Sequence, residues 1–156
     1  MSFQFFIQPA QAAEPLLIPG MGLELRVTLP PTVSGDSLVL METVNAPGFG
    51  PPLHRHRETE IFRVLEGRYL YEVDGERFEA GAGDTVSVPG GAVHAFVNIS
   101  AAPARQLVMM LPAMDAFAFF EGLGRIFAQG RPTREALNAY GSPWHVAFLG
   151  GPIHAK

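Results

Sequence analysis

Three histidines and one glutamate in the middle of the chain form a set of side chains that can hold a metal ion. His54, His56 and Glu60 lie close together in sequence, and His94 follows in a second stretch between residues 83 and 98. Three imidazole nitrogens and a carboxylate oxygen complete a coordination sphere for a divalent transition metal and leave positions for water or substrate. Because the chain has no cysteine, nitrogen and oxygen are the available ligand atoms, and we expect one Fe, Mn, Ni, Cu or Zn ion.

The backbone must bend for these four side chains to meet. Residues two apart on a strand point to the same side about 6.6 Å apart, so His54 and His56 can both reach one ion. On a straight strand Glu60 would lie about 13 Å beyond His56, so we expect the chain to turn between them. His94 enters a later strand after a tight turn in which Gly91 can adopt a positive φ. The two strands must therefore close on each other, as they do in a rolled-up barrel.

The elements that carry these residues are predicted to be short strands. Glycine and proline number 17 and 14, and they are spread along the chain as turns between apolar runs. Asp74-Gly75 predicts a two-residue type I′ turn, which places Tyr71 opposite Phe78, both toward the interior, and Glu72 opposite Arg77. After an irregular or edge segment at 3–20, we expect roughly nine or ten strands, including 22–29, 38–44, 69–73, 76–80, 85–88, 93–99 and 105–111.

The pattern changes after Pro112. Helical spacing of apolar residues predicts a helix over 114–129, and Pro132 followed by Gly141 predicts a shorter helix over 133–140. We expect the apolar tail at 144–150 to pack back on the barrel. The chain of 156 residues is long enough for one domain. We therefore divide it into a β-barrel with an N-terminal edge segment at 1–112 and a helical extension at 113–156 packed on the same domain.

The amino-acid composition indicates which classes of protein this chain could belong to. Hydrophobic residues make up 47% and charged residues 17%, which indicates a folded chain. A net charge of −4 and the lack of a Lys/Arg run argue against nucleic-acid and anionic-membrane partners. The most apolar stretch, 107–127, is interrupted by proline and charged residues, and the N-terminus lacks a basic region before a long apolar one. We expect a soluble, cytoplasmic protein with a small-molecule substrate.

Two motifs around the four ligands resemble those of the cupin superfamily. They are Gly48-x5-His54-x-His56-x3-Glu60-x6-Gly67 and Gly83-x5-Pro89-x-Gly91-x2-His94-x3-Asn98, with every position filled. The stretch between them, 68–82, is short, as in many microbial single-domain cupins. The resemblance implies an all-β jelly-roll barrel (a double-stranded β-helix), here with one or two C-terminal helices. It also implies that the four ligands hold the metal. Because members of the superfamily often dimerise, it implies a homodimer as well.

Several functions are compatible with such a site. The predicted substrate wall is apolar and aromatic, and consists of Phe62, Val64, Tyr71, Phe78 and Phe96. Resemblance to quercetinase-like small cupins favours a dioxygenase acting on a small aromatic or enolisable substrate, with Glu60 as the candidate catalytic base. A zinc-dependent cyclase or isomerase without redox chemistry is an alternative, and a non-catalytic cupin that binds a small ligand is another.

Further expectations concern residues other than the four ligands. Glu58 is expected to point away from Glu60 as a solvated charge, and His145 and His154 are expected to be surface or packing residues. Ordinary burial is favoured for four further phenylalanines, with a cavity mouth or a dimer contact as the alternative: Phe49, Phe117, Phe119 and Phe120. Outward apolar positions on the motif strands require a cover from the C-terminal helices or a partner subunit, which favours a homodimer. These positions are Ile61, Leu65, Val93 and Val97.

Overall fold

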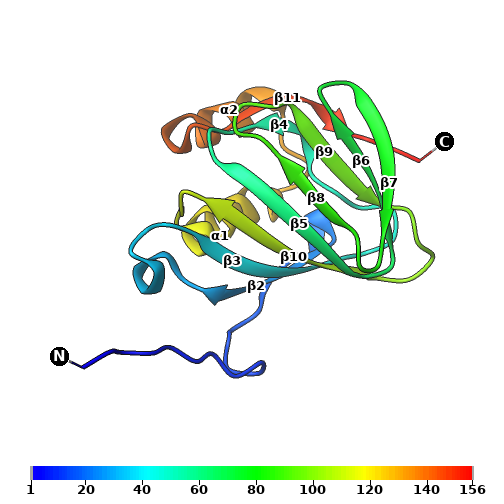
Figure 1. Ribbon diagram of the computed structural model, residues 1–156. Helices are drawn as coiled ribbons and strands as arrows, with labels where there is room; N and C mark the ends of the chain where they lie inside the picture. Colours follow the sequence, from blue (N-terminus) through cyan, green and yellow to red (C-terminus); the bar gives the residue numbers. More distant parts are fainter. Residues whose placement is uncertain (1, 156) are drawn as a thin grey trace.

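The computed structural model describes residues 2–155, whose strands form two antiparallel sheets that close on a shared core (Figure 1). The six-stranded sheet has the order β1 (Leu16–Ile18), β2 (Leu23–Leu29), β3 (Val39–Asn45), β10 (Ala104–Leu111), β5 (Thr59–Glu66) and β8 (Thr85–Val88). The five-stranded sheet has the order β11 (Ala147–Pro152), β4 (Pro52–Arg55), β9 (His94–Asn98), β6 (Arg68–Val73) and β7 (Glu76–Gly81). The predicted all-β jelly-roll class, with two C-terminal helices, is confirmed.

Alternation of side chains builds the core between the sheets. Along β3 every second residue is buried, and β10, which pairs with it, alternates in the same way. The inward positions of these two strands are not all apolar, because Thr43, Asn45 and Gln106 are buried among them. Phe62 and Tyr71 are fully or almost fully buried in the same core. Each large apolar side chain buried in this way contributes about 1.5–3 kcal/mol to folding.

The hairpin of β6 and β7 has the predicted turn and register. Asp74 and Gly75 have φ values of 47° and 85°, as a type I′ turn requires, and Tyr71 pairs with Phe78. Phe78 stacks on Tyr71 with ring centroids 5.6 Å apart, but its side chain is 40% exposed. The expectation that Phe78 lies in the interior is wrong, because β7 is an edge strand with no neighbour to cover it.

Two helices follow the barrel strands, as predicted. The side chain of Asp115 caps the N-terminus of α1 (Ala116–Phe127), and that of Thr133 caps α2 (Arg134–Gly141). The buried face of α1 packs beside β1 and the 3-10 helix η1 (Pro19–Met21). The remaining 3-10 turns are η2 (Pro31–Ser34) and η3 (Ser142–Trp144).

The C-terminal tail does pack back, and it does so as a strand. β11 pairs with β4 in the five-stranded sheet, so the segment after the helices completes the barrel. Its Gly-Gly-Pro sequence has poor strand propensity, and for that reason the sequence pattern did not predict this strand. Hydrogen bonding to β4 stabilises this segment as a strand in spite of its low intrinsic strand propensity.

The outer apolar positions are covered unevenly. Val97 is 2% exposed because Ile153, just after β11, packs against it, so the C-terminal tail rather than the helices provides this cover. Leu65 is 40% exposed. The homodimer stays a prediction. Among residues 2–155, no helix has both the length and the hydrophobicity required to cross a membrane.

Candidate metal centre

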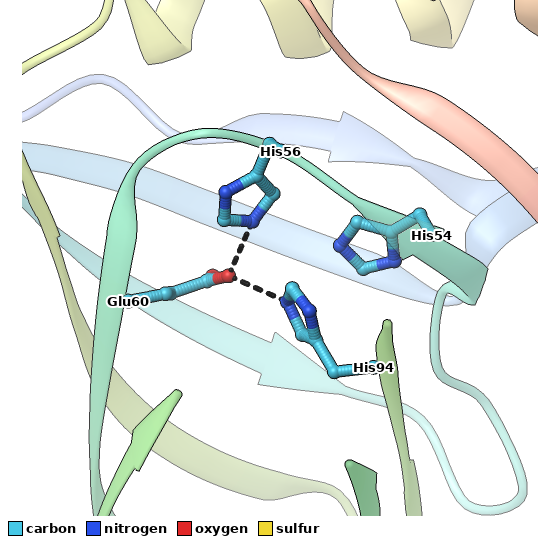
Figure 2. Close-up of side chains that lie close together, drawn as sticks. All are labelled: His54, His56, Glu60 and His94. Carbon is cyan, nitrogen blue, oxygen red and sulfur yellow. Dashed lines mark hydrogen bonds and ion pairs between the residues drawn. The ribbon is translucent and has the colours of Figure 1, made fainter. Parts of the chain in front are cut away.

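The four predicted ligands converge where β4 ends and β5 and β9 begin (Figure 2). His54 lies on β4 directly opposite His94 on β9, and Glu60 reaches in from β5. One ligand atom from each of the four residues lies within 4.8 Å of all the others. Metal–nitrogen bonds of about 2.1 Å place two ligands on opposite sides of an ion about 4.2 Å apart. The cluster therefore fits a single transition-metal ion after a contraction of a few tenths of an ångström.

The turn expected between His56 and Glu60 is present and is held by a second turn. The backbone N–H of Gly91 donates to the carbonyl of His56 over 2.7 Å, and Gly91 has the predicted positive φ, 88°. A Cβ atom on Gly90 would lie only 2.1 Å from the carbonyl oxygen of Arg57. Glycine is therefore required at position 90 for the two turns to approach each other.

Backbone carbonyls orient all three imidazoles. Each ring donates through Nδ1 to the carbonyl of a residue two positions away in the chain. The acceptors are Pro52 for His54 (2.8 Å), Glu58 for His56 (3.0 Å) and Ala92 for His94 (2.9 Å). A hydrogen bond at Nδ1 leaves Nε2 as the ligand atom and fixes the ring, which is the usual arrangement around metal-binding histidines.

Glu60 is the charge centre of the cluster. Its Oε2 lies 2.9 Å from Nε2 of His56 and 3.0 Å from Nε2 of His94, within hydrogen-bond distance of both. Burial raises the pKa of Glu60, but the two hydrogen bonds and the histidine charges outweigh it and hold the pKa well below its ordinary value. The carboxylate is therefore ionised at neutral pH, as a metal ligand must be.

Two of the histidines have opposite pKa shifts. Burial, with the charges of His94 and His56, lowers the pKa of His54 from 6.5 to about 3. His54 is therefore neutral at pH 7 and can bind a metal without losing a proton. For His56, burial opposes the charged form, but the hydrogen bond and charge of Glu60 outweigh burial and raise the pKa.

Glu58 is not solvated, contrary to the expectation from sequence. Its side chain is 3% exposed, and its Oε2 lies 3.5 Å from Nδ1 of His56. A turn between His56 and Glu60 was expected to leave this charge in solvent, but residues 57 and 58, which do form the turn between β4 and β5, place the Glu58 side chain against the ring of His56. His145 and His154 are exposed and lie outside the cluster, as expected.

A cavity of about 90 Å³ adjoins the cluster. His54, His56 and Glu60 line one end of it, and most of its other walls are apolar. The barrel strands contribute Leu23, Leu25, Met41, Phe62, Phe96, Val108 and Met110, and the segment around α1 contributes Met114, Phe119, Phe120 and Leu123. The polar side chains along the remaining wall are Thr43 and Asn45.

The predicted substrate wall overlaps this cavity in part. Phe62 and Phe96 line it, whereas Val64, Tyr71 and Phe78 do not. Val64 and Tyr71 are buried in the barrel core instead. Sequence reasoning did not assign a wall role to Met114 or Leu123, although the apolar face of α1 was the available signal. Phe119 is buried in an apolar cluster, as ordinary burial predicts, and both Phe119 and Phe120 also line the cavity.

Comparisons with known proteins agree with this geometry. Residues 41–110 match the Cupin_2 family model, described as a cupin domain. An uncharacterized protein of Methanocaldococcus jannaschii is 34% identical over 93 residues, which are 58% of this chain and 74% of that protein. The epoxidase atD of Aspergillus terreus is 31% identical over 137 residues, 84% of this chain. The chain spans only 39% of the epoxidase's length.

Solved structures share the fold. An RmlC-like cupin from Shewanella frigidimarina superposes with a TM-score of 0.63 at 23% identity, over 73% of this chain and 96% of that one. The family-model match over residues 41–110 includes both histidine-bearing segments of this chain. The sequence match shows that residues 41–110 are a cupin domain, and the solved structure shows that the barrel has the cupin fold.

Proposed function

We propose that this cupin is a metal-dependent dioxygenase acting on a small aromatic or enolisable substrate. One observation carries the proposal: the ligand cluster forms the polar end of a cavity whose walls are mainly apolar. Such a cavity favours an apolar molecule and turns its oxygen atoms toward His54, His56 and Glu60. When bound, a redox-active divalent ion would supply coordination sites for an enolate or phenolate oxygen and for O2.

Glu60 is the residue proposed to move the substrate proton. It lines the cavity and is ionised at neutral pH, so its carboxylate can accept a proton from an enol or phenol hydroxyl. The Nδ1 hydrogen bonds of His56 and His94 to backbone carbonyls keep these two rings in place beside the carboxylate. Phe119 and Phe120 cover the cavity from α1 and exclude water from the reacting oxygen atoms.

Sequence similarity to an enzyme named for oxygen chemistry supports the proposal. The epoxidase of Aspergillus terreus aligns with 84% of this chain. An alignment of that length must include both histidine-bearing segments of this chain. Because this chain spans well under half of that enzyme, the similarity supports oxidative chemistry at the site and not a particular substrate.

Metal replacement with oxygen measurement tests the proposal. The protein would be loaded separately with Fe, Mn, Ni, Cu and Zn, and oxygen uptake measured on a panel of flavonols, aromatic diols and diketones. We expect uptake with at least one redox-active metal and none with zinc. Stoichiometric metal without uptake on any substrate would overturn the dioxygenase.

The two alternatives give different results in the same experiment. Turnover with bound zinc and no oxygen uptake would identify a cyclase or isomerase. Tight retention of a panel molecule without any product would identify a binding protein. For the Glu60→Gln variant, Glu66→Gln is the control, because Glu66 is an exposed carboxylate outside the cavity.

A further inference from the structure

A second, open cleft lies on the outer side of the barrel where β4, β11 and α2 meet, at the top of Figure 1. This outer cleft has a volume of about 570 Å³, which is in the range of small-molecule sites. Its side chains include Arg55, Arg57, Asn138, Ser142 and His145, and none of the described residues that line it is acidic. On a chain with a net charge of −4, two arginines in a cleft without carboxylates indicate a site for an anion.

Strand pairing explains why Arg55 points into the outer cleft. His54 on β4 pairs with Phe148 on β11, and both residues line the inner cavity beside the ligand cluster. Successive side chains of a strand point to opposite faces, so the next pair, Arg55 with Ala147, faces outward and lines the cleft. Ala147 contributes only a methyl group, which leaves room for a ligand beside the Arg55 side chain.

The two arginines differ in how far their charges are already offset. Nε of Arg57 lies 3.5 Å from Oε1 of the buried Glu58, but the Arg57 side chain is 66% exposed and keeps further N–H donors free. Within residues 2–155, no carboxylate forms an ion pair with Arg55, whose side chain is exposed. A guanidinium presents a planar fork of donors that matches two oxygens of a carboxylate or phosphate. Arg55 therefore offers the stronger contact for an oxyanion.

Neutral donors at the rim of the outer cleft add to the arginines. The hydroxyl of Ser142 and a ring N–H of His145 can each donate to an oxyanion. His145 has a φ of 59°, a conformation that residues other than glycine rarely adopt and that clusters at binding sites. The amide of Asn138 is already occupied, because its oxygen and nitrogen bond to the N–H and carbonyl of Phe148.

The outer cleft is separate from the inner cavity but lies next to it. His56 and Val146 line both spaces, and each of the two residues is 6% exposed. They form the wall between an inner space that is mainly apolar and an outer one that carries the arginines. A molecule in the outer cleft would thus lie against the turn that positions His56.

We propose that the outer cleft binds an oxyanion through Arg55 and Arg57, with Ser142 and His145 as further donors. The ligand class is a small molecule that carries a carboxylate or a phosphate group. This site does not include the ligand cluster, so the inference stands independently of the proposed dioxygenase.

Titration of the zinc-loaded protein with two oxyanions tests the site. The probes are inorganic phosphate and benzoate, and titration calorimetry at low ionic strength gives their affinities. We expect at least one of them to bind, and its affinity to fall as sodium chloride is added, because salt screens exposed charges. Tighter binding of phosphate would indicate a phosphate-bearing ligand, and tighter binding of benzoate a carboxylate.

Two variants alter the outer cleft in different ways. Arg55→Gln removes the charge that has no partner and should weaken the tighter-binding oxyanion about ten-fold. Ala147→Leu fills the space beside Arg55 without a change of charge and should weaken it as well. Arg63→Gln is the matched control, because Arg63 is an exposed arginine on β5 in the other sheet, and it should bind as the wild type.

Several outcomes would overturn the site. Neither oxyanion binds to the wild type, or Arg55→Gln keeps the wild-type affinity, as it would if the oxyanion bound to the zinc ion instead. An equal loss of affinity in Arg55→Gln and Arg63→Gln would show that only the net charge of the protein matters.

Because Arg55 lies between His54 and His56 in the chain, the zinc content and Tm of every variant are measured as well. If Arg55→Gln loses zinc, the decision falls to Ala147→Leu at full zinc occupancy. A weakened oxyanion affinity in that variant supports the site, and an unchanged affinity overturns it. Oxygen uptake plays no part in either result, so a failure here leaves the proposed function intact.

Discussion

The carboxylate of Glu58 lies 3.5 Å from Nδ1 of His56, at the opposite edge of the imidazole from Glu60, whose Oε2 lies 2.9 Å from Nε2. The ring of one candidate metal ligand thus lies between two acidic side chains, both of them almost buried. A carboxylate beside the distal nitrogen of a metal-binding histidine raises the basicity of the ring and limits its rotation. Glu58 is therefore placed to support the candidate metal centre by fixing the ring of His56.

Glu58→Gln should weaken metal binding about ten-fold while the fold is retained. The substitution removes the negative charge next to Nδ1 but keeps the backbone carbonyl that accepts its hydrogen bond. Competition with a chelator for bound zinc measures the change. Glu66→Gln, which alters an exposed carboxylate, is the control, and equal affinities in the two variants would contradict a supporting role for Glu58.

His56→Ala should lose most of the bound metal without unfolding the barrel. The variant removes one of four ligands, and His56 is not part of the packed apolar clusters that hold the two sheets together. Elemental analysis gives the metal content, and circular dichroism gives the fold. Wild-type metal content in this variant would show that the assigned ligand set is wrong.

Glu60→Gln should retain part of the metal but lose turnover by about 100-fold or more, because an amide cannot accept the substrate proton. The informative quantity is kcat at full metal occupancy, which separates lost metal from lost chemistry. A rate within about two-fold of wild type at equal occupancy would exclude Glu60 as the base.

The metal-free protein should lose stability as the pH falls below 6.5. The folded-state pKa of His54 is about 3, so between these values the unfolded chain binds a proton at His54 that the folded protein does not. Glu60, whose pKa is also lowered, adds to the loss below its ordinary value of 4.5. His56, with a raised pKa, contributes stability that is present below 6.5 and lost as the pH rises through its folded pKa.

Thermal unfolding between pH about 7 and about 4, in the presence of a chelator, measures this dependence. His54→Gln should flatten the decline of Tm toward acid. His154→Gln changes an exposed tail histidine and should keep the wild-type slope. An unchanged slope in His54→Gln would contradict the assigned cause.

Gly90→Ala should weaken both folding and metal binding. The added Cβ would lie 2.1 Å from the carbonyl oxygen of Arg57, so the turn that carries His56 and leads to Glu60 must move. Gly151→Ala is the matched control, because nothing lies within 4 Å of a Cβ at that position. If the two variants have the same Tm and zinc affinity, contact between the turns does not position the ligands.

Much of the fold could be predicted from the sequence, because turn residues and strand alternation depend on residues that are close together in the chain. Asp74-Gly75 has few backbone options between two alternating runs, so the hairpin and its register followed from residue types. β11 did not follow, because its Gly-Gly-Pro sequence becomes a strand only through its pairing with β4. Phe78 was misplaced because strand alternation gives the face of a residue but not whether a neighbouring strand covers it.

At the candidate site too, some features could be predicted from the sequence and others depend on the tertiary structure. Residue types, their spacing and the resemblance to the two cupin motifs predicted that His54, His56, Glu60 and His94 come together, and the structure brings them together. Only the tertiary structure revealed the buried place of Glu58, the cover that α1 forms over the cavity, and the outer cleft beside Arg55. These features depend on contacts between strands and turns far apart in the chain, and periodicity within one segment carries no information about such contacts.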